Sequence, residues 1–288
     1  MASTQPKSKG LSLHIGLNSV DPAGYGGWPG ILNACENDAR DMEKIAAARG
    51  FKTKILLTKE ATSAAVIAFL KGAAKQLAKG DELFLTYSGH GGQVPDGNGD
   101  EIDGIDETWC LYDRQLVDDE LYAYWALFQK GVRILMLSDS CHSGSVSKAV
   151  MGVLAGGPQI PIRDAAAVDY SAFRPKVIPL EKLDGAYKAQ QKTYDNIQKK
   201  LPSAEKVPVG AAVVLISGCQ DNQVSLDGQQ NGLFTEKLLN VWSGGTFKGS
   251  LKSFHKAIVG QMPFTQTPNY FVIGAKNAKF EAGSPFTI

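Results

Sequence analysis

The sequence predicts an α/β fold in which a mostly parallel sheet lies between two layers of helices. Six short runs of branched and aromatic residues alternate with helical patterns along the 288 residues. Several of these runs are apolar without alternation, which is typical of parallel strands covered on both faces. Strands and helices that alternate at this spacing favour a single sheet with helices on each side.

The strands and helices follow from local patterns. The expected strands are residues 11–17, 54–57, 82–87, 133–137, 212–217 and 269–273. A helix is expected over 37–49, where apolar residues recur at helical spacing and Gly50 supplies a terminator. A second helix is expected over 62–79, from the potential cap Thr62 to Gly80. Further helices are expected over 118–129, 233–242 and 250–259.

Residues 146–208 interrupt this pattern. Glycines and prolines come first, and a polar, lysine-rich tract follows that we expect to form a helix over 183–201. We interpret 151–208 as an insertion within one sheet, because no second core is visible, although a separate domain is the alternative. The expected organisation is a flexible start, 1–10, and one domain, 11–288, whose parts 11–150 and 209–288 flank the insertion.

Composition excludes several classes of protein. Thirty basic and twenty-nine acidic residues leave a net charge of +1, and no basic stripe suggests a nucleic-acid partner. The apolar runs fall far short of the ~20 residues of a membrane span. The polar first ten residues lack the features of a secretory signal, and the four cysteines are well separated. We therefore expect a cytoplasmic protein with free thiols.

A histidine and a cysteine follow directly after two of the predicted strands. Ligands bind at the carboxyl edge of an open parallel sheet, so we expect His90 and Cys141 to face one site. A cysteine thiolate attacks carbonyl carbon, and an imidazole accepts the thiol proton and later protonates the leaving amine. A buried structural cysteine and a core histidine are the alternative interpretation.

The segments around these residues resemble the catalytic motifs of metacaspases, which are caspase-like cysteine peptidases. Residues 87–92 read Tyr-Ser-Gly-His-Gly-Gly, and residues 139–144 read Asp-Ser-Cys-His-Ser-Gly. Segments 33–39, 118–120 and 216–223 match further family motifs in the same order, so the resemblance covers nearly the whole chain. It implies a caspase-like three-layer sandwich with six strands, like a bacterial orthocaspase or a type I core without a pro-domain.

The resemblance also implies roles for single residues. Cys141 would be the nucleophile of an endopeptidase that forms a thioester acyl-enzyme, and His90 the general base. The backbone N–H groups of Gly91 and Cys141 would form the oxyanion hole. His142 is a rival base that we interpret as structural, because adjacent side chains diverge. The alternative function is a catalytically silent, caspase-like domain that binds peptides or a regulatory partner.

Metacaspases cleave after arginine or lysine by means of an acidic pocket. Two carboxylates facing a cationic side chain would satisfy its charge in a partly buried site. The expected partners are therefore proteins or peptides with Arg or Lys at the cleaved bond, and the family implies a monomer. Without the resemblance, Asp38 would be interpreted as a carboxylate that stabilises the start of a helix, and Asp221 as a solvated loop residue. The residues that match the pocket are Cys35, Asp38, Ser88, Asp139 and Asp221.

Two further expectations come from the family. Many metacaspases are activated by calcium at aspartates that match Asp106, Asp118 and Asp119, so we expect Ca²⁺ as an activator. We expect no cofactor for the chemistry itself. A solvated acidic loop is the alternative, and Lys148 stands near another expected aspartate. Self-cleavage is expected in 151–208, because exposed flexible segments are preferred proteolysis sites and this one holds several Arg and Lys residues.

Overall fold

The sheet has the predicted six strands. The computed structural model describes residues 8–97, 99, 101, 104–141, 173–201, 207–220 and 223–288. The strands are β1 (Gly10–Gly16), β2 (Lys52–Leu57), β3 (Glu82–Ser88), β7 (Arg133–Asp139), β9 (Ala212–Ser217) and β11 (Asn269–Gly274). They lie in the order β11-β9-β7-β3-β1-β2, and only β11 runs antiparallel to its neighbour. The mostly parallel sheet is confirmed.

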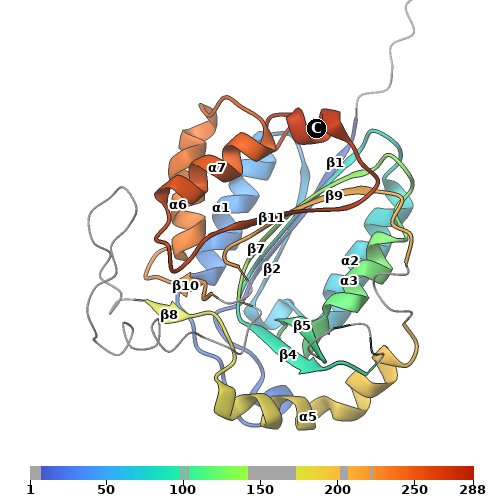
Figure 1. Cartoon of the computed structure of the whole chain (residues 1–288), viewed down its shortest axis with the longest axis vertical. Coiled ribbons are helices and arrows are strands. Elements are labelled where there is room, and N and C mark those ends of the chain that lie inside the picture. Colours follow the sequence, from blue (N-terminus) through green and yellow to red (C-terminus); the bar gives the residue numbers. More distant parts are fainter. Residues whose placement is uncertain are drawn as a thin grey trace, which may run out of the picture.

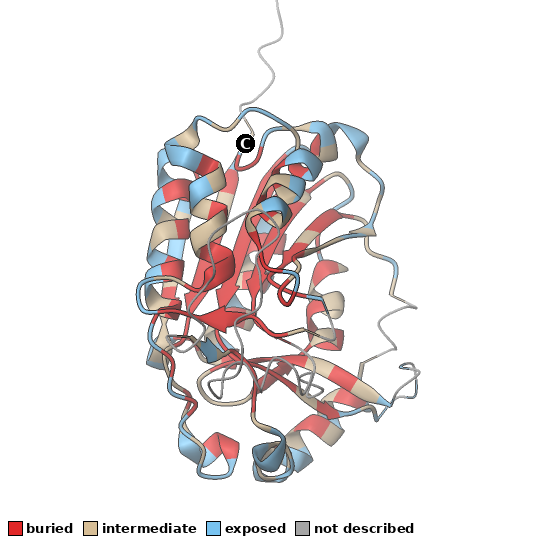
Figure 2. Ribbon diagram, turned by 60° about the vertical axis from the view of Figure 1, so that its left-hand side comes forward, coloured by how far each residue is buried: buried red, intermediate tan, exposed pale blue. Residues whose placement is uncertain are grey.

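Helices cover both faces of the sheet (Figure 1). One face carries α1 (Cys35–Ala48), α6 (Leu233–Trp242) and α7 (Leu251–Gln261), and the other carries α2 (Ser63–Gln76) and α3 (Asp118–Trp125). Alternation along β3 explains the two cores, because Phe84 packs in the first and Leu83 and Leu85 pack in the second. The sheet is therefore buried between two helix layers, as its red colour in Figure 2 shows.

Some predicted helix ends were wrong by a few residues. Helix α2 ends at Gln76 rather than at residue 79, because Leu77 turns to extended backbone and packs into the core. Helix α3 ends at Trp125 rather than at 129, where tight turns carry Phe128 into the same core. Helix α7 runs two residues past 259, and α1 and α6 match their expected ranges closely.

A second layer, which the sequence did not predict, lies at the carboxyl ends of the parallel strands (Figure 1). It consists of β4 (Gly91–Pro95), β5 (Ile105–Cys110) and β6 (Gln115–Val117), which form an antiparallel sheet. Helix α5 (Leu180–Gln198) packs against it, three residues earlier than the expected 183–201. Strand β8 (Arg174–Pro175) pairs with β10 (Leu226–Asp227). Short helices are η1 (Pro22–Tyr25), η2 (Thr58–Glu60), η5 (Ser243–Gly245) and α8 (Ala278–Ala282).

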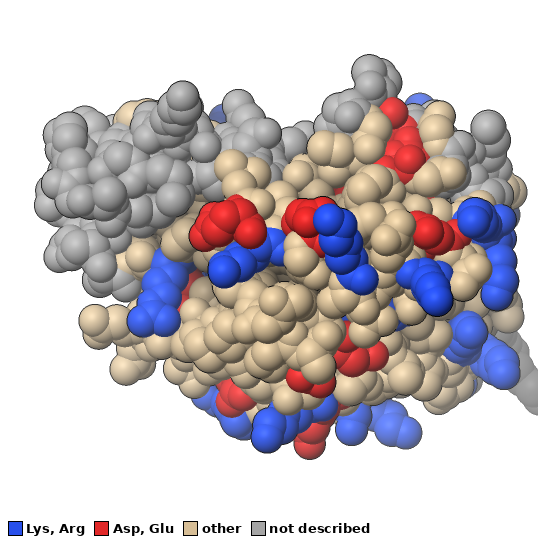
Figure 3. Space-filling view, turned by 90° about the horizontal axis from the view of Figure 1, so that it is seen from below, with Lys and Arg blue, Asp and Glu red and all other residues tan. Residues whose placement is uncertain are grey.

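The surface carries charges of both signs. On the face seen from below, acidic and basic side chains are interspersed, and neither sign gathers into a stripe (Figure 3). None of the helices in the described part of the chain is long and apolar enough to cross a membrane.

Candidate functional site

The loops after β3 and β7 meet at the carboxyl edge of the sheet. These strands are neighbours, and their last residues, Ser88 and Asp139, are paired in register. A side chain at Gly91 would overlap the backbone carbonyl of Cys141. Glycine at this position therefore allows the two loops to touch, which brings His90 and Cys141 to one site.

His90 is held by its surroundings in a neutral form. Its Nε2 lies 3.2 Å from the carbonyl oxygen of Gly30, and its ring packs against Trp28 with centroids 4.7 Å apart. Tyr87 donates its hydroxyl to the His90 carbonyl at 2.6 Å. Burial lowers the pKa of His90 to about 3, and the backbone groups of Gly30 and Val177 oppose this only in part. A proton on Nε2 leaves Nδ1, which makes no hydrogen bond within the described residues, as a base.

The Cys141 thiol is fully buried beside Ser225. The Ser225 N–H donates to Sγ, and Sγ lies 3.5 Å from the Ser225 carbonyl oxygen. A second thiol, Cys219, is close by and donates to the Ser140 carbonyl at 3.5 Å. The neighbouring Cys141 and burial both raise the pKa of Cys219. Cys219 therefore stays protonated.

Residues 173–178, which we call the cleft segment, cross this site as an extra strand. The carbonyl oxygen of Lys176 accepts hydrogen bonds from the N–H groups of Gly91 at 3.0 Å and Cys141 at 3.2 Å. The Lys176 N–H donates to the Ser225 carbonyl at 2.9 Å. Just before it, β8 pairs with β10. This is the geometry of a peptide bound by strand addition, with one carbonyl polarised by two donors.

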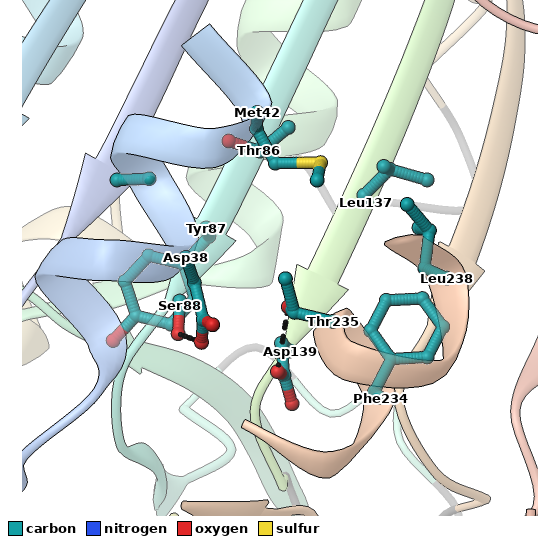
Figure 4. A pocket seen from close by; sticks show the side chains of 11 residues that line it. Asp38, Met42, Thr86, Tyr87, Ser88, Leu137, Asp139, Phe234, Thr235 and Leu238 are labelled. Carbon is teal, nitrogen blue, oxygen red and sulfur yellow. Dashed lines mark hydrogen bonds between the residues drawn. The ribbon is translucent and has the colours of Figure 1, made fainter. Parts of the chain in front are cut away.

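The Lys176 side chain ends in a buried acidic pocket. Its Nζ lies 2.9 Å from Ser88 Oγ, 3.0 Å from Asp139 Oδ2 and 3.1 Å from Asp38 Oδ2. Figure 4 shows these three side chains directed into one space between α1, β3, β7 and α6. A side chain at Gly232 would collide with Nζ, so glycine forms one wall. The pocket is thus shaped for an extended, cationic side chain.

The electrostatics of the pocket favour a charged lysine. Burial alone would lower the pKa of Lys176, but Asp139, Cys35, Asp38 and Asp227 outweigh it and hold that pKa well above its ordinary value. Burial raises the pKa of Asp38, and the ammonium group counteracts this effect. Each charge therefore depends on the other for its stability in this site.

Most of the predicted site residues lie together. Asp38, Ser88 and Asp139 touch the ammonium group, whereas the thiol of Cys35 is directed to Asp227 at 3.7 Å. Asp221, His142 and Lys148 lie outside the described residues. Sequence analysis missed several residues that hold the carboxylates and the peptide. Four of them lie on loops without a local pattern, several just after the motif at 216–223: Gly30, Ser225, Asn231 and Gly232. The fifth, Thr235, lies in the first turn of α6.

The aspartates proposed for calcium lie near the start of α3 and on β5. Asp106 accepts a hydrogen bond from Gln198. Burial raises the pKa of Asp118 well above its ordinary value, and the charges of Asp106, Glu107 and Asp119 add to this effect. The described residues include no group of three or more His, Cys, Asp or Glu side chains arranged to hold a metal. Calcium binding therefore stays a prediction.

Comparisons with known proteins find related sequences and structures. A family model described as "Caspase domain" matches residues 13–277. Metacaspase-1 of Mycosarcoma maydis is 31% identical over 93% of this chain and 70% of its own length. Metacaspase-1 of Kluyveromyces lactis is 30% identical over 77% of this chain. The chain spans 55% of that relative and 54% of Metacaspase-1 of Cryptococcus neoformans.

Two solved structures share the fold. Protein GSU0716 from Geobacter sulfurreducens is 50% identical, with a TM-score of 0.85 over 97% of this chain and 99% of that one. Caspase-1 from Spodoptera frugiperda has a TM-score of 0.55 at 10% identity, over 95% of this chain and 92% of that one. The second similarity concerns the fold alone.

Proposed function

The chain belongs to the caspase-domain family of cysteine peptidases, and we propose that it is an endopeptidase that cleaves after lysine or arginine through Cys141 and His90. One observation carries this proposal. Lys176 lies in the cleft as a substrate would, with its carbonyl oxygen between two N–H donors and its ammonium group between two carboxylates.

The first chemical step is acylation of Cys141. The thiol turns from Ser225 toward the substrate carbonyl, and His90 Nδ1 accepts its proton. A bond forms between Sγ and the carbonyl carbon, and the N–H groups of Gly91 and Cys141 hold the negative oxygen. The protonated His90 then delivers its proton to the amide nitrogen as the C–N bond breaks. The Gly30 carbonyl keeps the ring oriented throughout.

The second step is hydrolysis of the thioester. Water attacks the acyl carbon while His90 accepts one of its protons; the bond to Sγ then breaks, and His90 returns that proton to the departing thiolate. The products are a peptide that ends in a lysine or arginine carboxylate and a free Cys141 thiol. Apart from water, no group outside the described site is needed to balance these steps.

The acidic pocket supports selection of a basic residue. An ammonium group gains three partners there, whereas an aspartate would place a third carboxylate beside Asp38 and Asp139. A cavity of ≈ 10 Å³, about the size of one water molecule, lies among the pocket residues. A fluorogenic peptide series with Lys, Arg or Asp before the reporter group tests this selection. Turnover of the Lys and Arg peptides and its loss in Cys141→Ala are expected, and a preference for Asp would contradict the assignment.

We also propose that the chain cleaves itself between Lys176 and Val177. The bond follows the carbonyl that the two donors hold, and the Val177 backbone lies at His90. Lys176→Gln should remain one band on a gel, whereas the matched Lys182→Gln, at an exposed position on α5, should be cut like the wild type. A new amino terminus at Val177, found by mass spectrometry, identifies the bond.

A catalytically silent domain that binds its own cleft segment is the competing function, since an intact segment already occupies the cleft. It predicts the same uncut band for wild type and Cys141→Ala, and no turnover of any fluorogenic peptide.

Calcium activation and a monomeric state rest on the resemblance alone, and a cytoplasmic location rests on composition. We propose that Ca²⁺ acts as an activator through Asp106, Asp118 and Asp119, and that the protein is a cytoplasmic monomer. Calorimetry with Ca²⁺ should show binding heat that Asp118→Asn abolishes. Sedimentation should give the 30.8 kDa mass of one chain, although the partly exposed Phe271 lies on the edge strand β11.

A further inference from the structure

The cleft segment continues beyond Lys176–Val177, and its next side chain fills a second pocket. Ile178 is 1% exposed, although it belongs to a connecting segment. Its N–H donates to the Gly91 carbonyl at 3.0 Å, while the Gly91 N–H donates to the Lys176 carbonyl at 3.0 Å. Gly91 therefore holds the peptide on both sides of the Lys176–Val177 bond. The position of residue 178 relative to that bond is set by backbone geometry.

The walls of this pocket include parts of the protein outside the cleft segment. Val20, Tyr25 and Cys110 are buried in one apolar cluster with Ile178, and Trp28 packs against that cluster. The Tyr25 hydroxyl donates to the Leu111 carbonyl at 2.6 Å, which fixes its ring. These residues come from the loop around η1 and from β5. The pocket therefore belongs to the same frame that orients His90 through Trp28.

Gly92 supplies the space for the isoleucine. A Cβ at this position would lie 2.7 Å from Ile178 Cδ1 and closer still to Gln115 Oε1, both too close for any real contact. Burial raises the pKa of Cys110, so its thiol adds no charge to the pocket. A charged side chain in this pocket would lose its water, and none of the wall residues named above carries a charge to compensate it.

We propose that this pocket is a substrate subsite for a large aliphatic side chain two residues after the cleaved bond. The preferred substrate is then Lys or Arg, any residue, and Ile, Leu or Val. The inference rests on the proposed peptidase function and adds a determinant on the leaving side of the bond. Helix α5 also reaches the cluster through Ala186 and Leu183, so the alternative is that Ile178 only anchors that helix.

Internally quenched peptides that span both sides of the bond test the subsite. The parent peptide copies residues 173–181, Phe-Arg-Pro-Lys-Val-Ile-Pro-Leu-Glu. Replacing its isoleucine by alanine should lower kcat/KM about tenfold or more, because each lost buried methylene costs a factor of about four. Replacing it by aspartate should lower kcat/KM about a hundredfold, because the carboxylate also loses its water. The matched control replaces the leucine that copies Leu180, which is 66% exposed in the protein. That change should leave kcat/KM within about threefold.

A variant of the enzyme provides the second measurement. Gly92→Ala places a methyl group in the pocket. The ratio of kcat/KM for the isoleucine peptide to kcat/KM for the alanine peptide should therefore fall toward one. This ratio does not depend on how much of the variant folds. Equal rates for the isoleucine, alanine and aspartate peptides with wild type would overturn the subsite and leave the peptidase function standing. Failure of wild type to cut any peptide faster than Cys141→Ala would overturn the function itself.

Discussion

Replacing Asp38 by asparagine tests the acidic pocket most directly. Asp38 lies on α1, far in the chain from Cys141, and its Oδ2 is 3.1 Å from Lys176 Nζ. Its Oδ1 accepts hydrogen bonds from the Asn231 side chain and the Gly232 N–H, both at 3.0 Å. Asparagine keeps the shape and one acceptor oxygen but removes the charge. The variant therefore changes mainly the electrostatics of the pocket.

The size of the effect follows from burial. Removing one partner from a buried ion pair costs about 3–5 kcal/mol, because the remaining charge loses its compensation. Asp139 remains 3.0 Å from the ammonium position, so we expect the lower end, about 3 kcal/mol. This corresponds to a decrease of about two orders of magnitude in kcat/KM for lysine peptides. The ammonium contact is the same before and during bond cleavage, so the loss should lie mostly in KM.

The assay compares a lysine peptide with one that has a neutral glutamine before the cleaved bond. Asp38→Asn should lower kcat/KM for the lysine peptide and should change the glutamine peptide much less. The matched control is Asp184→Asn, which removes an exposed carboxylate paired with Lys188 on α5 and should change neither rate. A thermal unfolding curve for each variant checks that the protein is folded.

Two results would refute this reasoning. A loss of less than fivefold for the lysine peptide would mean that Asp38 does not bind the cation. Equal losses for both peptides would mean that the substitution disturbs the site in general. In either case the position of Lys176 would reflect packing of the cleft segment rather than substrate recognition.

Three further variants probe other parts of the site and the core. Gly91→Ala should lower kcat about 10²–10³-fold, because the added methyl group would overlap the Cys141 carbonyl and force the two oxyanion donors apart. Activity within tenfold of wild type would contradict this. Gly232→Ala should raise KM for lysine peptides at least tenfold, because the methyl group fills the place of Nζ, and an unchanged KM would place the cation elsewhere. His14→Gln tests pH dependence: burial lowers the pKa of His14 to about 3, so only the unfolded wild type binds this proton between pH 6.5 and 3, and stability falls as pH falls. Between pH 7 and pH 5, urea unfolding should show that the free energy of unfolding of the variant falls about 2 kcal/mol less than that of wild type. Equal decreases would refute the lowered pKa of His14.

Most of the secondary structure was visible in local patterns. Strands such as β3 and β7 are apolar along their whole length because both faces are covered, and helices α1 and α6 have one apolar face each. These signals depend only on neighbours in the chain. The antiparallel sheet β4-β5-β6 was missed because its strands are short and rich in glycine and polar residues, so that long-range pairing decides their conformation.

The candidate site divides in the same way. The motifs around His90 and Cys141 could be identified because each follows a predicted strand, and chain order then places both at one sheet edge. The carboxylates Asp38 and Asp139 came from the resemblance. Their partners Gly232 and Thr235 carry no local signal, because they reach the pocket only after distant segments pack together.

The sequence by itself determined the sheet, the helix layers and the pair of residues for the proposed chemistry, because periodicity and motif order are local properties. Only the tertiary structure decided which of the many lysines and arginines lies in the acidic pocket. No local pattern singles out one basic residue among those of 151–208. Among the residues that the structure describes, one backbone carbonyl, that of Lys176, meets the N–H groups of Gly91 and Cys141. That selection depends on strand addition at β10 and on the fit of Ile178, which are contacts between residues far apart in the chain.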